Sequence, residues 1–171
     1  WWSKNTEADR EIRHRFEALV LRAEDGVLDP WRSTIQGKLA LILLTDQFPR
    51  NIYRDTADAF RFDHLARSVC LESLETRAER DLRPIQRLFF YLPLEHSEDG
   101  DHQHLCVSLV EELAADVPVE DRSVFEGFVD FALRHKAIID RFGRYPHRNE
   151  ILGRSSTPLE EAFLQQPGSS F

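Results

Sequence analysis

Apolar residues recur at steps of three and four along most of this chain, which is the spacing of one face of an α-helix. The apolar positions between residues 12 and 23 follow this rule. Gly26 marks the end of that helix, because glycine readily adopts the left-handed conformation that closes helices. No segment alternates strictly between apolar and polar residues, as a half-buried strand would. The pattern therefore predicts an all-α fold.

Residues that cap or break helices divide the N-terminal half of the chain. One capping box is predicted at Thr6 and a second at Ser33. The second helix is expected to be central and buried, because residues 39–44 are apolar on every face. This helix is expected to stop at Pro49, and Asp63 is expected to cap the next one.

The C-terminal half is divided in the same way. Pro84 suits the first turn of a helix that Pro93 is expected to limit. Ser97 is expected to cap the following helix, and a long helix is predicted over residues 120–142. A capping box that begins at Thr157 predicts the start of the last helix.

Length and composition agree with one globular domain. The chain has 171 residues, of which 42% are hydrophobic and 30% charged. No tract rich in glycine, serine or proline separates two parts. Short connections between about seven helices then predict a single all-α domain over residues 1–171 with antiparallel helix packing. The chain begins WWSKN and contains no methionine, so we interpret it as lacking native residues upstream.

Charge and cysteine content narrow the range of partners. The net charge of −8 disfavours binding to nucleic acid. The longest aliphatic run, LALILL, is far shorter than the ~20 residues that span a bilayer, so no membrane segment is expected. Cys70 and Cys106 each lie in an apolar helical pattern. We interpret them as buried thiols rather than a disulfide, which fits a cytoplasmic protein.

Four polar clusters interrupt the helical pattern, each near a predicted helix end, where unpaired backbone groups make a site easiest to build. The first is TDQFPRN, which contains Asp46, Arg50 and Asn51. Asp46 falls on the apolar face of the buried helix and needs a partner, of which Arg50 is the nearest cation. Both a structural ion pair and a ligand site fit this segment.

The second cluster is LPLEHSED, in which Glu95 and two further acids surround His96. Such an arrangement raises the pKa of an imidazole or offers oxygen and nitrogen ligands to a metal. It matches no zinc spacing, and acidic residues also suit the first turn of a helix. His102 and Cys106 lie one turn apart on the next helix, which is too small a set for a metal site. Neither a metal nor a cofactor is therefore predicted.

The third candidate is not a group but a single residue, His135. It continues a stripe of apolar residues at steps of three and four, formed by Phe128, Ala132, Ile139 and Phe142. Its imidazole is therefore expected to point toward the core. Two interpretations fit: a hydrogen-bonded core residue, or a base or ligand anchor that lines a pocket.

The fourth cluster is RFGRYPHRNEILGRSSTP, residues 141–158, which contains four arginines. Arginine forks suit carboxylate and phosphate oxygens. Gly143 is expected to end the preceding helix, and the arginines beside it complement the helix dipole. These reasons do not explain His147, Arg148 and Asn149, which follow the helix end. We therefore predict a functional role for at least two of these three residues.

Three long motifs occur in a fixed order: ALILLTDQFPRNIYRDTADAF, RLFFYLPLEHSED and HKAIIDRFGRYPHRNEILGRSSTPLEEAFL. With them the chain resembles, over nearly its whole length, an uncharacterised bacterial family catalogued as domain of unknown function nine-two-four. The resemblance implies an all-helical fold grouped with tetratricopeptide-like superhelices. It implies no activity, so no catalytic role is carried over to any residue.

The residues leave three functional hypotheses open. The first is a binding module whose clusters converge on one polar pocket for an anionic small molecule or a peptide. The second is a small hydrolase or transferase in which His96 or His135 is the general base, oriented by Glu95 or Asp99, and arginines stabilise the developing negative charge. The third is a salt-bridge network with a structural role alone. The predicted lining of the pocket is Asp46, Arg50, Asn51, Glu95, His96, His135, Arg144, His147, Arg148 and Asn149.

Overall fold

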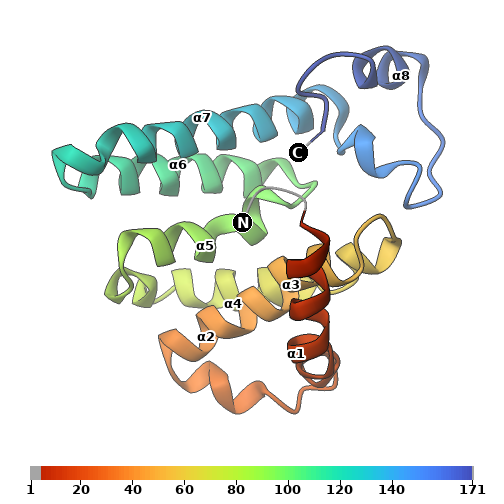
Figure 1. Ribbon diagram of the computed structural model, residues 1–171. Coiled ribbons are helices and arrows are strands. Elements are labelled where there is room, and N and C mark those ends of the chain that lie inside the picture. The colour runs from red at the N-terminus through yellow and green to blue at the C-terminus, as the bar shows by residue number, and fades with distance from the viewer. Residues whose placement is uncertain (1–4, 171) are drawn as a thin grey trace. The chain divides into compact units, whose positions relative to one another are not determined.

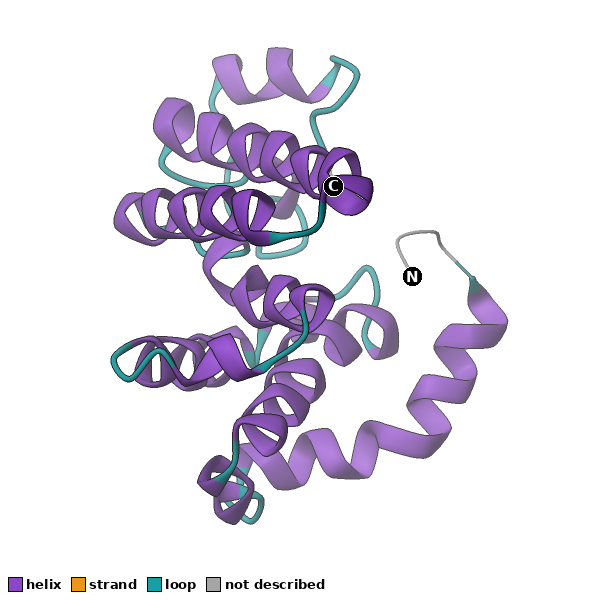
Figure 2. Ribbon diagram, turned by 90° about the vertical axis from the view of Figure 1, so that its left-hand side faces the viewer, coloured by secondary structure: helices purple, strands orange, loops and turns teal. Residues whose placement is uncertain are grey.

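The computed structural model describes residues 5–170, and every regular element in that range is a helix (Figure 1, Figure 2). The prediction of an all-α fold with about seven helices is confirmed, since this range contains eight α-helices and several shorter helical turns. Within the same residues, no helix has both the length and the apolar character needed to cross a bilayer. The chain divides into two compact units, one ending at Pro93 and the other beginning at Leu94. Each is described by itself, and the single domain stays a prediction.

The first unit consists of helices joined by short 3₁₀ turns. Its buried residues include Leu39, Leu41, Ile42 and Leu44, which confirms that the aliphatic run of the second predicted helix lies in the core. The elements are α1 (Thr6–Glu24), η1 (Asp29–Ser33), α2 (Ile35–Ile42), the π-helical turn η2 (Leu43–Gln47), α3 (Phe48–Ile52), η3 (Ala57–Phe60), α4 (Asp63–Leu74), η4 (Ala78–Asp81) and most of α5 (Pro84–Glu95).

Two predicted caps in this unit are displaced by one residue. Asn5, not Thr6, caps α1, because its side-chain oxygen accepts from two backbone N–H groups of the first turn at 3.0 Å each. Thr34, not Ser33, caps α2 by accepting from the backbone N–H of Gly37 at 3.1 Å. In both places the neighbouring residue is also a good N-cap, so local chemistry alone does not choose between them.

The prediction that Pro49 stops the second helix is wrong. The chain widens after α2 into the π-helical turn η2, and α3 then begins at Phe48 with Pro49 in its first turn. At that position the missing N–H of proline costs no hydrogen bond, and its fixed φ suits a helix. The wider turn interrupts the regular hydrogen-bond ladder just before the proline. Pro93 likewise lies inside α5, which continues to Glu95.

The second unit is built on an antiparallel pair of helices, α6 (Gly100–Asp116) and α7 (Val119–Phe142) (Figure 1). The connection between them is too short for any other arrangement. A 3₁₀ turn, η5 (Pro146–Arg148), and a short helix, α8 (Pro158–Leu164), follow. The buried residues of the pair include Leu109, Val110, Leu113, Phe125, Ala132, Ile138 and Ile139.

The helix ends of the second unit follow the predicted chemistry with one exception. Gly143 has a φ of 68° and closes α7, and Thr157 forms the predicted capping box with Glu160. The exception is α6, which is capped by Asp99 and not by Ser97. The hydroxyl of Ser97 instead accepts from the backbone N–H of Asp99 at 3.3 Å, which holds the capping residue in place.

Candidate functional site

Five of the predicted residues gather in the second unit around the ring of Tyr145. We call this group the Tyr145 cluster: Glu95, His96, His135, Tyr145, His147 and Arg148. The guanidinium carbon of Arg148 lies 4.5 Å from the centroid of the Tyr145 ring. The rings of His135 and His147 lie 5.7 and 5.5 Å from that ring, and the ring of His96 lies 6.5 Å from the ring of His135. The end of α5, the middle of α7 and the turn η5 therefore all contribute to the cluster.

The course of the chain after α7 places Tyr145 at the centre. The left-handed Gly143 ends the helix, and Pro146 favours the extended backbone seen at Tyr145, with φ −89° and ψ 106°. The Tyr145 backbone N–H donates to Glu98 Oε1 at 2.8 Å, and its hydroxyl donates to the carbonyl of Glu95 at 2.5 Å. Burial raises the pKa of the Tyr145 hydroxyl above its usual value, so the hydroxyl remains a hydrogen-bond donor.

Gln103 holds the end of α5 from the side of α6. Its Nε2 lies 2.7 Å from the carbonyl oxygens of Glu95 and Ser97, and 3.2 Å from that of Leu94. The same nitrogen lies 2.9 Å from the hydroxyl of Tyr145. Carbonyls at a helix C-terminus need donors from outside the helix, and this fully buried amide supplies them. Sequence reasoning missed Gln103, because a glutamine within a helix gives no signal of which backbone groups it will meet.

His135 is buried, as its position on the apolar stripe predicted, with 3% of its surface exposed. Its Nδ1 lies 2.9 Å from the carbonyl of Phe131, so the neutral ring donates there and carries its lone pair on Nε2. Burial lowers the pKa of His135 to about 3, with smaller contributions from His96 and Arg148. The same Nδ1 is 3.9 Å from Glu95 Oε1, which is longer than a hydrogen bond.

His147 is neutral at physiological pH for a similar reason. Burial lowers the pKa of His147 to about 4, and the positive charges of Arg148 and Arg154 lower it further, while Glu98 opposes them. His96 and His147 are half-buried, whereas the other members of the cluster are buried. These two imidazoles are therefore the members most accessible to a ligand.

Arg144 and Arg154 shape the loop after α7 through ion pairs within the chain. Nε and Nη2 of Arg144 donate to the two carboxylate oxygens of Glu160 at 2.7 and 2.8 Å. The two terminal nitrogens of Arg154 donate to Glu98 at 2.6 and 2.9 Å. Arg144 was predicted to line a ligand pocket, but its fork faces the carboxylate that caps α8.

The acids of these two pairs are held in the ionised form. The guanidinium of Arg144 lowers the pKa of Glu160 well below its usual range. Burial opposes the ionisation of Glu98, but Arg154 and the backbone N–H of Tyr145 outweigh it, so the pKa of Glu98 is also lowered. Asn149, another predicted ligand residue, is buried and donates from Nδ2 to Ser156 Oγ at 3.0 Å. Its amide therefore also joins parts of this loop.

The predicted residues of the TDQFPRN segment lie in the first unit, where the expected ion pair is present. Arg50 Nη1 lies 3.4 Å from Asp46 Oδ1, and the fork of Arg50 pairs with both oxygens of Asp63 at 2.8 and 3.0 Å. Asp63 is thus an ion-pair partner in the first turn of α4 and not its side-chain cap. Asp46 is fully buried, and its Oδ2 accepts from Gln47 Nε2 at 2.6 Å.

Asn51 belongs to a second group in the same unit. Its Nδ2 donates to Asp9 Oδ1 at 2.9 Å, and Arg54 pairs with both oxygens of Asp9 at 2.9 Å. In the capping box predicted at Thr6, Asp9 would stand in for the usual glutamate, but its carboxylate instead joins α1 to Asn51 in α3 and to Arg54 after it. A pocket shared by these first-unit residues and the Tyr145 cluster stays a prediction.

The two cysteines and His102 lie outside the Tyr145 cluster. Cys70 and Cys106 are free and buried, as predicted, and burial raises the pKa of the Cys70 thiol. His102 Nδ1 is 2.9 Å from Ser97 Oγ. Among residues 5–170, no group of three or more histidine, cysteine, aspartate or glutamate side chains is arranged to hold a metal ion.

The fold and this site define an all-α protein with a guanidinium, imidazoles and a carboxylate packed around one buried tyrosine. The chain belongs to a family of bacterial proteins of unknown function, DUF924, whose pattern matches residues 1–168. This confirms the family resemblance seen in the three motifs. The chain is also similar to a solved structure, that of the protein of unknown function ATU0120 from Agrobacterium tumefaciens. The two share 35% sequence identity and a TM-score of 0.85, over 96% of this chain and 88% of that one. No match was found among curated proteins.

Proposed function

We propose that the second unit binds a small anion, or the carboxylate of a peptide, at the Tyr145 cluster. Arg148 binds the anionic oxygens, and the half-buried imidazoles of His96 and His147 form the edge of the site. The observation that carries the proposal is the gathering of Arg148, His135 and His147 around a single buried ring. Arg148 itself is only 7% exposed, so its charge acts in largely desolvated surroundings.

The electrostatics of the cluster support an anionic ligand. After burial, which is the larger cause, the charge of Arg148 lowers the pKa values of both His135 and His147. Burial disfavours a charge of either sign, but the positive charge of Arg148, which opposes a second cation, attracts an anion. A guanidinium also matches two oxygens of a carboxylate or phosphate with parallel hydrogen bonds. The Tyr145 ring restricts the rotation of this guanidinium, which reduces the entropy lost on binding.

The same geometry gives no support to the hydrolase or transferase alternative in which His135 is the general base. A general base held by a carboxylate needs a hydrogen bond between the two groups. Nδ1 of His135 donates to a backbone carbonyl and lies 3.9 Å from Glu95. Nδ1 of His102 is likewise 3.9 Å from Asp99. Neither pair has the distance that this catalysis requires.

The proposal is tested by thermal unfolding with sodium phosphate, citrate and a short peptide that ends in a free carboxylate. A ligand at about one hundred times its Kd stabilises the folded protein by about 2.7 kcal/mol, which raises the Tm of a chain of this size by roughly 5–10 °C. Arg148→Lys keeps the charge but removes the fork, and it is expected to lose most of this shift. Arg134→Ala is the matched control, because Arg134 is an exposed residue of α7 paired with Asp130 at 3.1 Å.

Three results would contradict the proposal. One is the absence of a shift with every probe in the unmodified chain. Another is an equal shift in Arg148→Lys. The third is a loss of the shift in Arg134→Ala as large as that in Arg148→Lys. If no probe stabilises the protein but Arg148→Ala lowers the Tm sharply, the structural network is the better explanation.

A further inference from the structure

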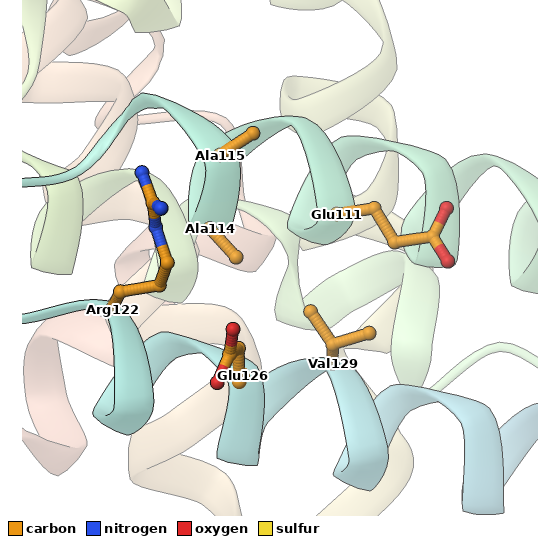
Figure 3. A pocket seen from close by; sticks show the side chains of 6 residues that line it. All are labelled: Glu111, Ala114, Ala115, Arg122, Glu126 and Val129. Atoms are coloured by element: carbon orange, nitrogen blue, oxygen red, sulfur yellow. The ribbon is translucent and has the colours of Figure 1, made fainter. Parts of the chain in front are cut away.

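A second feature of the second unit lies toward the other end of the helix pair. A hollow of about 380 Å³ opens between α6 and α7, lined by Glu111, Ala114, Ala115, Arg122, Glu126 and Val129 (Figure 3). It begins about 12 Å along α6 from Gln103, so it is separate from the Tyr145 cluster. The hollow exists because two alanines on α6 leave space opposite Val129 on α7.

The α7 side of the hollow belongs to a longer exposed stripe. Val119, Arg122, Glu126, Val129 and Leu133 follow steps of three, four, three and four, so they share one face of the helix. Val119 is 76% exposed and Leu133 is 44% exposed. Apolar side chains therefore lie at least partly exposed on this stripe beyond both ends of the hollow.

The charge of this region is strongly one-sided. Residues 111–130 contain a single basic residue, Arg122, and seven acidic residues: Glu111, Glu112, Asp116, Glu120, Asp121, Glu126 and Asp130. Glu120 and Asp121 stabilise the start of α7 through its dipole. That reason does not apply to Glu111 and Glu126, which lie inside their helices on either side of the hollow.

We propose that this face, which we call the α6–α7 groove, docks a basic amphipathic helix of a partner protein. The apolar residues of such a helix cover Val119, Val129 and Leu133. The methylene stem of a lysine or arginine lies on Ala114 and Ala115, and its charged head reaches Glu111 or Glu126. Amphipathic helices bind apolar grooves in this way, with charges at the rim setting the orientation. Arg122 repels a second cation at its own end of the groove, which fixes the direction of the partner.

The test is fluorescence anisotropy of the whole chain with three labelled peptides. The probe is a short peptide of lysine and leucine arranged at helical spacing. The comparison peptides replace either leucine by serine or lysine by glutamate. The lysine–leucine peptide is expected to bind, and the other two are expected to bind much more weakly, because each lacks one half of the complementarity.

Variants then locate the binding. Glu111→Gln combined with Glu126→Gln is expected to weaken binding about fivefold, the effect of losing two exposed ion pairs. Ala115→Phe, at an exposed position, fills the hollow and is expected to weaken binding more. The matched control is Glu150→Gln combined with Glu161→Gln, which removes the same charge from exposed positions elsewhere in this unit. The affinity of this control variant for the lysine–leucine peptide is expected to stay within twofold of that of the unmodified chain.

Several outcomes would overturn the proposal. Equal binding of the lysine–serine peptide would indicate general attraction to an acidic chain. Equal losses in the groove variants and the control pair would place the peptide elsewhere. If the lysine–leucine peptide does not bind, the proposed docking surface is refuted. Amide chemical shifts that change on residues 111–133 upon titration would support it.

Discussion

Replacement of Gln103 by glutamate would place an oxygen where an amide nitrogen now meets backbone carbonyls. Nε2 of Gln103 lies 2.7 Å from the carbonyl oxygens of Glu95 and Ser97 and 3.2 Å from that of Leu94. A carboxylate at this point has no hydrogen to donate to them. Because Gln103 is fully buried, water does not readily replace the lost bonds.

The size of the destabilisation by Gln103→Glu follows from the number of amide hydrogens that are lost. The amide has two N–H bonds, so at least two buried acceptors lose their donor, and each loss costs about 1–3 kcal/mol. The expected destabilisation is therefore about 2–6 kcal/mol, or a Tm lowered by roughly 4–24 °C for a chain of this length. Gln103→Leu loses the same donors without adding a charge, so its effect is expected to be smaller.

The pH dependence separates this mechanism from general loss of packing. Burial against carbonyl oxygens raises the pKa of the introduced carboxyl above its unfolded value of about 4.3. The stability that its protonated form provides is therefore present at low pH and is lost as the pH rises through the folded-state pKa. Gln103→Glu should approach Gln103→Leu in stability near pH 5 and fall below it near pH 8.

Thermal melts followed by circular dichroism at both pH values test this reasoning. Gln36→Glu is the control, because it makes the same change at an exposed position in the first turn of α2, and it should shift the Tm little. A Gln103→Glu variant as stable as the unmodified chain near pH 8 would refute the role assigned to Gln103.

Three further predictions follow. The chain should lose stability as the pH falls from about 6.5 toward 4, by at most about 1.4 kcal/mol per pH unit for His147, because the unfolded imidazole takes up its proton first. His147→Gln should reduce the slope of the urea-unfolding free energy against pH in this window, while the slope that His135 contributes remains. Glu160 has a lowered pKa, so its contribution is present above the usual glutamate pKa and lost in acid. Glu160→Gln should therefore be less stable than the unmodified chain near pH 7, and acid-unfolding curves should show that difference shrinking at low pH. Cys70 and Cys106 are buried, so a thiol reagent should label them only after unfolding in guanidinium chloride.

The local chemistry of the chain determined most of the helices. Gly143 and the Thr157 capping box were predicted correctly, because each acts within one turn of its own helix. The burial of His135 was also predicted, because residues three and four apart share a helix face. The role of Pro49 was predicted wrongly. In the sequence, a proline in the first turn of a helix cannot be told from a proline that ends one, and only the structure of the preceding residues decides between them.

Only the tertiary structure decided which side chains meet. Arg154 and Glu98 are 56 residues apart in sequence, and Tyr145 and Glu95 are 50 apart. Several arginines compete for several acids with the same chemistry, so the sequence could not show that Arg144 pairs with Glu160 while Arg148 lies over Tyr145. Glycine and proline positions identified the loop after α7. The contacts of that loop with Glu95 at the end of α5, with α6 and with α7 decided which of its residues hold the loop in place and which form the Tyr145 cluster.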